Sequence, residues 1–253
     1  WLASRPHGMM LMTGPTGSGK TTTLYAALSE VNDGRQKIIT VEDPVEYQLH
    51  GVLQVPVNER TGMTFSRGLR AILRHDPDTI LVGEIRDEET AQIAVQAALT
   101  GHLVLSSIHA NTAFDVLARF LHMGVDPYNL TSALNGVVAQ RLVRLNCARC
   151  REEVPRSAAV RERFPQLRAA APAARGRGCG ECRGTGYRGR VAIAEVLIAD
   201  HALREGILQR ESPRRLRERA VGAGMRRMVE DAVALFERGL TTEEELLRVA
   251  EME

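Results

Sequence analysis

Several features that often point to a function are scarce in this sequence. Aromatic residues make up only 4% of the 253 residues, which leaves few rings on which nucleic-acid bases could stack. The formal net charge is only +2, so it gives no reason to expect nucleic acid or an anionic membrane as a partner. No apolar run reaches the length of a membrane span, and no secretory signal opens the chain. We therefore expect a protein without a direct membrane span that does not bind nucleic acid.

Cysteine is scarce too, and its placement is informative. The chain has four cysteines, which form two CxxC pairs, Cys147 with Cys150 and Cys179 with Cys182. Without a signal peptide we expect the cytosol, where such pairs favour a metal site over disulfides. This spacing suits a tetrahedral Zn²⁺ with four thiolates, a closed site of the structural kind. Four free cysteines are the alternative. A redox role is not favoured, because it needs a reactive CxxC on a thioredoxin-like unit and the sequence shows no such context.

The chain opens on Trp1 rather than Met, so we expect a fragment of a longer protein. Hydrophobic residues make up 44% of it and charged residues 25%, enough for a packed core. In the first half, short apolar runs alternate with helical patterns, which predicts a parallel sheet covered on both faces. The expected strands cover residues 9–13, 37–41, 79–82, 103–108 and 191–198, and the expected helices cover residues 21–32, 87–100 and 126–144.

The pattern changes after Cys147. Residues 155–178 are rich in Arg, Ala and Pro, so we expect a poorly packed excursion between the two CxxC pairs. The tail has helical patterns, in which Thr242 and Glu245 have the spacing of a capping box.

One motif carries specific chemistry. The eight residues that match GxxxxGK[ST] are Gly14, Pro15, Thr16, Gly17, Ser18, Gly19, Lys20 and Thr21. The glycines let backbone N–H groups surround phosphate oxygens, and the following helix directs its positive end towards them. Lys20 would contact the β- and γ-phosphates, and the Thr21 hydroxyl would take a Mg²⁺ position. A strand before and a helix after the motif favour an ATP site over an ordinary glycine-rich turn.

ATP hydrolysis needs two further acids. Glu84 is our candidate for holding Mg²⁺ or its water, although Gly83 separates it from the apolar run where the common motif has the acid. The alternative for Glu84 is a surface carboxylate at a strand end. Glu42 is our candidate for polarising water, because it ends a strand at the edge where open parallel sheets bind ligands. Alone, the pair Glu42 and Asp43 before a proline more often forms a turn.

Histidines and arginines complete the set of candidates. His102 and His109 flank the strand 103–108, where a lone histidine is usually structural. His109, at the far end, is the better candidate for sensing the γ-phosphate. Four arginines could balance phosphate charge, although solvated or ion-paired arginines are the usual case: Arg67, Arg70, Arg74 and Arg86.

Taken in order, these motifs resemble the ATPase family that drives bacterial type II secretion and type IV pilus assembly. The resemblance covers essentially the whole chain. The segments that carry it are 14–21 (Walker A), 41–47 (Asp box), 67–78 with 81–87 (Walker B region), 100–109 (His box), 139–142 and the tetracysteine segment. In that family the Walker B acid follows a glycine, as Glu84 follows Gly83 here.

The resemblance implies an α/β fold in three parts. These are a RecA-like P-loop core over residues 1–146, a zinc-binding tetracysteine subdomain over 147–190, and a C-terminal strand and helical region over 191–253. It implies that Glu42 is the catalytic glutamate, that Glu84 is a Mg²⁺-linked acid and that His109 belongs to a nucleotide-responsive box. It also implies a homo-hexamer with ATP sites between subunits, and a further N-terminal domain that supplies arginines.

The implied function is that of a cytoplasmic motor docked to the bacterial inner membrane through platform and adaptor proteins. Secretion and pilus-assembly members carry the four cysteines and retraction members lack them, which disfavours retraction. The segment 67–74 favours secretion over pilus assembly, which remains the alternative. Two other classes stay open: a nucleic-acid motor with a zinc ribbon, and a non-catalytic nucleotide-binding scaffold. Few aromatics argue against the first, and the joint presence of Lys20, Thr21, Glu42 and Glu84 argues against the second.

Overall fold

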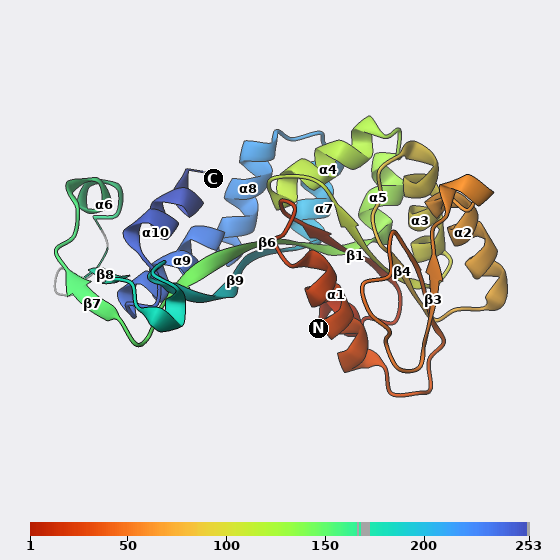
Figure 1. Ribbon diagram of the computed structural model, residues 1–253. Coiled ribbons are helices and arrows are strands. Elements are labelled where there is room, and N and C mark those ends of the chain that lie inside the picture. Colours follow the sequence, from red (N-terminus) through yellow and green to blue (C-terminus); the bar gives the residue numbers. More distant parts are fainter. Residues whose placement is uncertain (166, 168–172, 252–253) are drawn as a thin grey trace. The chain divides into compact units, whose positions relative to one another are not determined.

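A seven-stranded sheet organises the fold, with its strands in the order β3-β2-β4-β5-β1-β6-β9 (Figure 1). The computed structural model describes residues 1–165, 167 and 173–251. The strands are β1 (Gly8–Thr13), β2 (Ile38–Glu42), β3 (Val52–Pro56), β4 (Thr79–Val82), β5 (Leu103–Ile108), β6 (Leu134–Asn146) and β9 (Tyr187–Ile198). The pairs from β3 to β6 are all parallel, which confirms the predicted parallel sheet.

Contacts divide the chain into two units. Unit 1 consists of Trp1–Ala139 and Val196–Met225, and unit 2 consists of Gln140–Glu195 and Arg226–Glu253. No helix in the described part of the chain is long and apolar enough to cross a membrane.

Unit 1 contains the parallel strands and the helices that cover them. Every residue of β1, β2, β4 and β5 is buried, as expected for strands with helices on both faces. Figure 1 shows α1 on one face of the sheet and α3 with α5 on the other. The helices of this unit are α1 (Lys20–Val31), α2 (Phe65–Ile72), α3 (Glu88–Leu99), α4 (Ala113–His122), α5 (Pro127–Ala133), α7 (His201–Leu208) and α8 (Pro213–Gly222).

The predicted helix over 126–144 is wrong beyond its first two turns. Asp126 caps α5 as expected, accepting hydrogen bonds from the N–H groups of Tyr128 and Asn129, but the chain turns into strand β6 at Leu134. The apolar spacing of this segment suits a helix as well as a strand, and pairing with β1 decides between them. On its other side β6 lies close to β9, because a Cβ at Gly136 would lie 2.7 Å from the Leu197 carbonyl oxygen.

Unit 2 contains shorter elements around the four cysteines. They are β7 (Arg151–Val154), β8 (Ala173–Gly176), α6 (Ala158–Arg163), α9 (Met228–Glu237) and α10 (Glu243–Ala250), together with the unit's parts of β6 and β9. The segment 155–178 was expected to be poorly packed, but where it is described it holds α6 and β8, and Val160 and Ala173 are fully buried. The rest of that expectation, on residues 166 and 168–172, lies outside the described residues.

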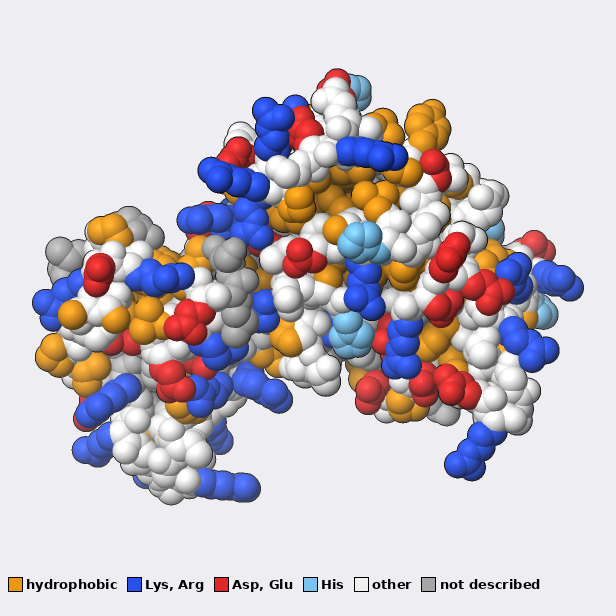
Figure 2. All heavy atoms as spheres, turned by 90° about the horizontal axis from the view of Figure 1, so that it is seen from above, with side chains coloured by type: hydrophobic (Ala, Val, Ile, Leu, Met, Phe, Trp, Pro, Cys, Tyr) orange, Lys and Arg blue, Asp and Glu red, His pale blue; other side chains and the backbone are white. Residues whose placement is uncertain are grey.

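Charged side chains of both signs are spread over the surface. Lys and Arg side chains and Asp and Glu side chains are both found across the face drawn in Figure 2. This distribution agrees with the small net charge of the chain, +2.

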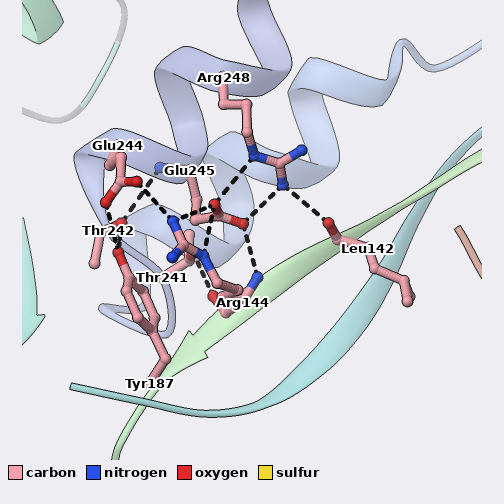
Figure 3. Close-up of polar contacts among 8 residues, drawn as sticks. All are labelled: Leu142, Arg144, Tyr187, Thr241, Thr242, Glu244, Glu245 and Arg248. Atoms are coloured by element: carbon pink, nitrogen blue, oxygen red, sulfur yellow. Dashed lines mark hydrogen bonds and ion pairs between the residues drawn. The ribbon is translucent and has the colours of Figure 1, made fainter. Parts of the chain in front are cut away.

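A buried glutamate fastens helix α10 within unit 2 (Figure 3). Thr242 caps α10 as predicted, accepting from the Glu245 N–H, but the Glu245 carboxylate does not return the bond to Thr242. Only 1% of Glu245 is exposed, and its carboxylate lies between two guanidinium groups. Arg144 on β6 donates to Oε1 through Nε at 3.0 Å, and Arg248 on α10 donates to Oε2 through Nη2 at 2.8 Å. The Arg144 backbone N–H also donates to Oε2, at 2.8 Å.

Candidate functional site

The phosphate-binding motif forms the turn between β1 and α1. Gly17 and Gly19 have φ angles of 77° and 85°, a left-handed conformation that glycine adopts without steric cost. Lys20 is the first residue of α1, and its ammonium donates to the carbonyl oxygens of Gly14 at 2.8 Å and Pro15 at 3.1 Å. Burial lowers the pKa of Lys20, and the negative charge of Glu84 works in the opposite direction. The lysine is thus folded over the loop, next to an acid.

The P-loop opens onto a cavity of about 600 Å³. Thr16–Thr21 line it, together with the four residues that the sequence predicted from other elements: Glu42, Glu84, Arg86 and His109. They meet because β2, β4 and β5 are parallel and end at the same edge of the sheet. The first two residues of the motif, Gly14 and Pro15, line a second hollow of about 490 Å³ to which His109 also contributes.

Glu84 lies in the turn after β4, between a histidine and an arginine. Its Oε1 accepts a hydrogen bond from Arg86, and its Oε2 lies 3.3 Å from His109 Nε2. The hydrogen bond to Glu84 is the main cause of a raised pKa at Arg86. Glu84 Oε2 is buried and has no hydrogen bond within the described part of the chain. A buried carboxylate oxygen of this kind, in a cavity that also contains Thr21, fits the oxygen chemistry that Mg²⁺ prefers.

Gly83 explains the spacing between β4 and this acid. A Cβ at Gly83 would lie 3.3 Å from both the Glu42 Cα and the Val41 carbonyl oxygen. The Gly83 N–H donates to that carbonyl oxygen at 2.8 Å. The two strand ends therefore approach each other through backbone atoms, and a side chain at Gly83 would be packed more tightly than is usual against the end of β2.

Glu42 is the last residue of β2, and only 3% of it is exposed. Thr40 Oγ1 donates to its Oε1 at 2.5 Å, and Gln54 Nε2 donates to the same oxygen at 3.1 Å. The hydroxyl of Tyr25, on α1, donates to Oε2. Sequence reasoning missed all three donors, because Tyr25 and Gln54 stand on other elements and no local motif marks them.

The other predicted candidates differ in whether they line the cavity. Arg67 donates to the Gly62 carbonyl oxygen at 2.9 Å, and Arg70 pairs with Glu89 at 2.8 Å. Neither lines the cavity, and nor does Arg74, so Arg86 is the one predicted arginine of the four that does. His102 precedes β5 at its other end, with Nδ1 3.0 Å from the Ala97 carbonyl oxygen.

The four cysteines meet in unit 2. Their sulfur atoms all lie within 4.8 Å of one another, and all four are free thiols. The Sγ atoms of Cys147 and Cys179 are 3.9 Å apart, and those of Cys179 and Cys182 are 3.7 Å apart. Four thiolates about 2.3 Å from a tetrahedral ion would be roughly 3.8 Å apart. The cluster is therefore placed to bind a metal ion.

The backbone around Cys182 favours its thiolate, whereas burial raises the pKa of Cys150 to about 11. Burial raises the pKa of Cys182, but the N–H groups of Cys179 and Gly186, aimed at its sulfur at 3.1 and 3.3 Å, outweigh burial and lower the pKa to about 6. The two knuckles are also linked by charge, since Glu181 pairs with Arg149 at 2.6 Å and with Arg188 at 2.5 Å.

Comparison with known proteins agrees with this geometry. "Type II secretion system protein E" of Pseudomonas aeruginosa is 50% identical over 250 residues, 98% of this chain and 50% of the relative. "Type II secretion system ATPase E" of Vibrio cholerae is 48% identical over 249 residues, 98% of this chain and 49% of the relative. The chain thus spans about half the length of the curated relatives it matches.

Solved structures share the fold. The pilus retraction motor PilT with bound ADP has a TM-score of 0.72 and 31% identity, over 98% of this chain and 62% of PilT. The ATPase DotB of Legionella pneumophila has a TM-score of 0.72 and 23% identity, over 100% of this chain and 62% of DotB, a likeness of fold alone. The family described as "Type II/IV secretion system protein" matches residues 2–248. With the P-loop cavity, the parallel sheet and this match in agreement, the chain belongs to the family of type II/IV secretion system proteins.

Proposed function

We propose that this chain is the ATP-hydrolysing part of a motor that powers type II protein secretion by assembling a pseudopilus. The observation that carries the proposal is the P-loop cavity, where Lys20 and Thr21 meet Glu42 and Glu84. The two relatives at about 50% identity, named for type II secretion, favour that branch of the family. Type IV pilus assembly is the second candidate, and the fold shared with PilT supports a pilus-type motor.

The geometry suggests a role for each group. Lys20 and the P-loop N–H groups would hold the phosphates. Glu42 would orient a water and accept its proton, since its carboxylate ends a strand at the cavity. Glu84, with Thr21, would hold Mg²⁺, which neutralises phosphate charge when bound. Arg86 and His109 contact Glu84, so they would respond to the charge at that position.

The cysteine cluster and the assembly belong to the same proposal. We propose that Zn²⁺ occupies the four thiolates, because its tetrahedral geometry matches the sulfur separations. The segments 1–146, 147–190 and 191–253 would act as motor core, zinc subdomain and C-terminal region. The complete protein would work as a homo-hexamer in the cytoplasm, held at the inner membrane by platform and adaptor proteins.

A nucleic-acid motor is the weaker alternative. A nucleic-acid motor has a basic stripe and stacking aromatics along its strand. Here both acidic and basic side chains occur over the face drawn in Figure 2, and aromatics make up 4% of the chain. Stimulation of ATP turnover by DNA or RNA would favour this alternative and count against secretion.

The test is Mg²⁺-dependent ATP turnover by the protein and by Lys20→Ala. The variant loses charge-assisted contacts to phosphate, so we expect ATP affinity to fall on the order of a hundredfold and turnover to fall with it. Arg70→Ala serves as the control, since Arg70 pairs with Glu89 on the surface, away from the cavity. An unaltered ATP affinity in Lys20→Ala would remove the P-loop from the proposed role.

A further inference from the structure

We propose that Tyr25 is a positioning residue for Glu42: its hydroxyl fixes the carboxylate so that one oxygen, Oε2, keeps a single acceptor position for the attacking water. The inference rests on the proposed function of Glu42. It assigns a task in ATP hydrolysis to a residue of helix α1 that lies outside the phosphate-binding motif.

The first observation is that the Tyr25 hydroxyl can donate in only one direction. Tyr25 is fully buried, and its oxygen accepts from the Glu46 N–H at 3.3 Å. Gln54 Nε2 lies 3.3 Å from the same oxygen, but its two protons have shorter partners in Glu42 and Tyr47. A phenol has one proton, and here that proton is directed at Glu42 Oε2.

The second observation is the count of acceptor positions on the carboxylate itself. Each carboxylate oxygen offers about two lone-pair positions. On Oε1 both are taken, by Thr40 at 2.5 Å and Gln54 at 3.1 Å. On Oε2 Tyr25 takes one. One acceptor position therefore remains on the Glu42 carboxylate, and Glu42 lines the cavity next to the P-loop.

The third observation is that the donor keeps its proton. Burial raises the pKa of Tyr25 well above its ordinary value, and the hydrogen bond to Glu42 with its negative charge raises it further. The raised pKa keeps the hydroxyl protonated around neutral pH, so it remains a donor to Glu42.

The same contacts reach a loop that lines the cavity. Gln54 Oε1 accepts from the Leu49 N–H at 2.7 Å, and Gln54 Nε2 donates to the Tyr47 carbonyl oxygen at 3.2 Å. The Tyr47 ring meets the Tyr25 ring edge-on with centroids 4.7 Å apart. The loop after β2 is thus fastened to the groups that hold Glu42, and so a change in the loop would alter the carboxylate.

The experiment compares Tyr25→Phe with Tyr187→Phe. Each removes a hydroxyl that donates to a glutamate, since Tyr187 donates to Glu244 Oε2 at 3.0 Å in unit 2. For Tyr25→Phe we expect kcat to fall on the order of tenfold or more, with KM and ATP affinity unchanged, because the hydroxyl touches the carboxylate and not the phosphates. Tyr187→Phe should retain kcat. A purely structural role would instead lower ATP affinity along with kcat.

The outcomes separate this inference from the proposed function. If Glu42→Gln turns over normally, Glu42 is not the catalytic group and the proposed function fails at that residue. If Glu42→Gln is inactive while Tyr25→Phe keeps its full kcat, only the inference about Tyr25 is overturned.

Should Tyr25→Phe no longer bind ATP, a ring-fluorinated tyrosine at position 25 keeps the ring and strengthens the donor. An unchanged kcat in that protein would overturn the inference, and a changed kcat at constant affinity would support it.

Discussion

Three glutamates are almost fully buried in the described part of the chain, and two of them, Glu42 and Glu245, are held in opposite ways. Glu245 in unit 2 lies between Arg144 and Arg248, which donate to it through their guanidinium groups. Glu42 in unit 1 receives hydrogen bonds from a phenol, a hydroxyl and an amide, and the described residues include no cation paired with it.

The different partners of the two carboxylates determine what each carboxylate can do. The charge of Glu245 is balanced within the protein, and its acceptor positions are filled, so it fastens α10 to β6 and has no capacity left for a ligand. The Glu42 carboxylate is held in place by neutral donors and its charge is not paired with a cation. It can therefore still accept a proton from water or bind a cation at the cavity. Neutral donors position a reactive group, whereas cationic donors neutralise a structural one.

Removing the metal should have the largest effect, and it should fall on unit 2. Structural zinc binding contributes on the order of 10 kcal/mol to folding in small zinc domains, and the cysteine cluster belongs to that unit. We expect one zinc per chain by metal analysis, and a large drop in thermal stability on chelation or in Cys179→Ser. ATP binding should survive better than thermal stability, because the P-loop lies in unit 1. Purified protein with four reactive thiols and no metal would contradict this.

Glu42→Gln should show the next largest effect, on rate alone. General base catalysis contributes about 10²–10⁴-fold, so we expect turnover to fall by that order while ATP stays bound. The free energy of unfolding should fall only modestly, because the Gln amide group faces donors on one side of Glu42 while a buried charge is removed. Single-turnover kinetics with ATP affinity and urea unfolding would measure both. A large loss of stability would show that Glu42 is structural, like Glu245.

Glu245→Gln should show the reverse pattern. Breaking a buried ion pair costs about 3–5 kcal/mol, and the partly exposed arginines here can turn to solvent, so we expect about 3 kcal/mol of lost stability. Turnover per folded chain should stay the same. Glu244→Gln is the matched control: it contacts the same Arg144 at 2.7 Å but its side chain is 68% exposed, so less than about 1 kcal/mol is expected. Equal losses in the two variants would remove the contrast.

Acid should produce the smallest effect. Burial tends to raise the pKa of Glu245, but hydrogen bonds from Arg248 and Arg144 outweigh it and lower the pKa below the ordinary 4.5. A lowered pKa in the folded state stabilises the fold fully above about 4.5, and this stabilisation is lost as pH falls through the folded-state value. The free energy of unfolding should therefore decline more steeply below that pH in the parent than in Glu245→Gln. Parallel curves would mean that Glu245 does not contribute to the acid response.

Local sequence features predicted the fold where periodicity and motif agreed. The strand–loop–helix around Lys20 and the buried strands of unit 1 follow from their own residues. The segment 134–146 did not, because its apolar spacing fits both a helix and a strand, and only pairing with β1 resolves it.

The site could be predicted from the sequence only where motifs and strand ends place its residues. Glu42, Glu84, Arg86 and His109 could be placed together because parallel strands end at one edge. The donors around Glu42 could not, since Tyr25 and Gln54 are ordinary residues of a helix and a strand until tertiary packing brings them to the carboxylate.

Gly83 has a consequence for how this site can change in evolution. Its missing side chain lets the backbones of two strand ends touch, with only 3.3 Å from an added Cβ to the Glu42 Cα. A Cβ at this position would press on the end of β2, which would have to shift by a few tenths of an ångström, and Glu42 and Glu84 are both attached to that contact. Substitutions there should therefore favour a second change at the end of β2, so that the two positions vary as a pair among distant relatives.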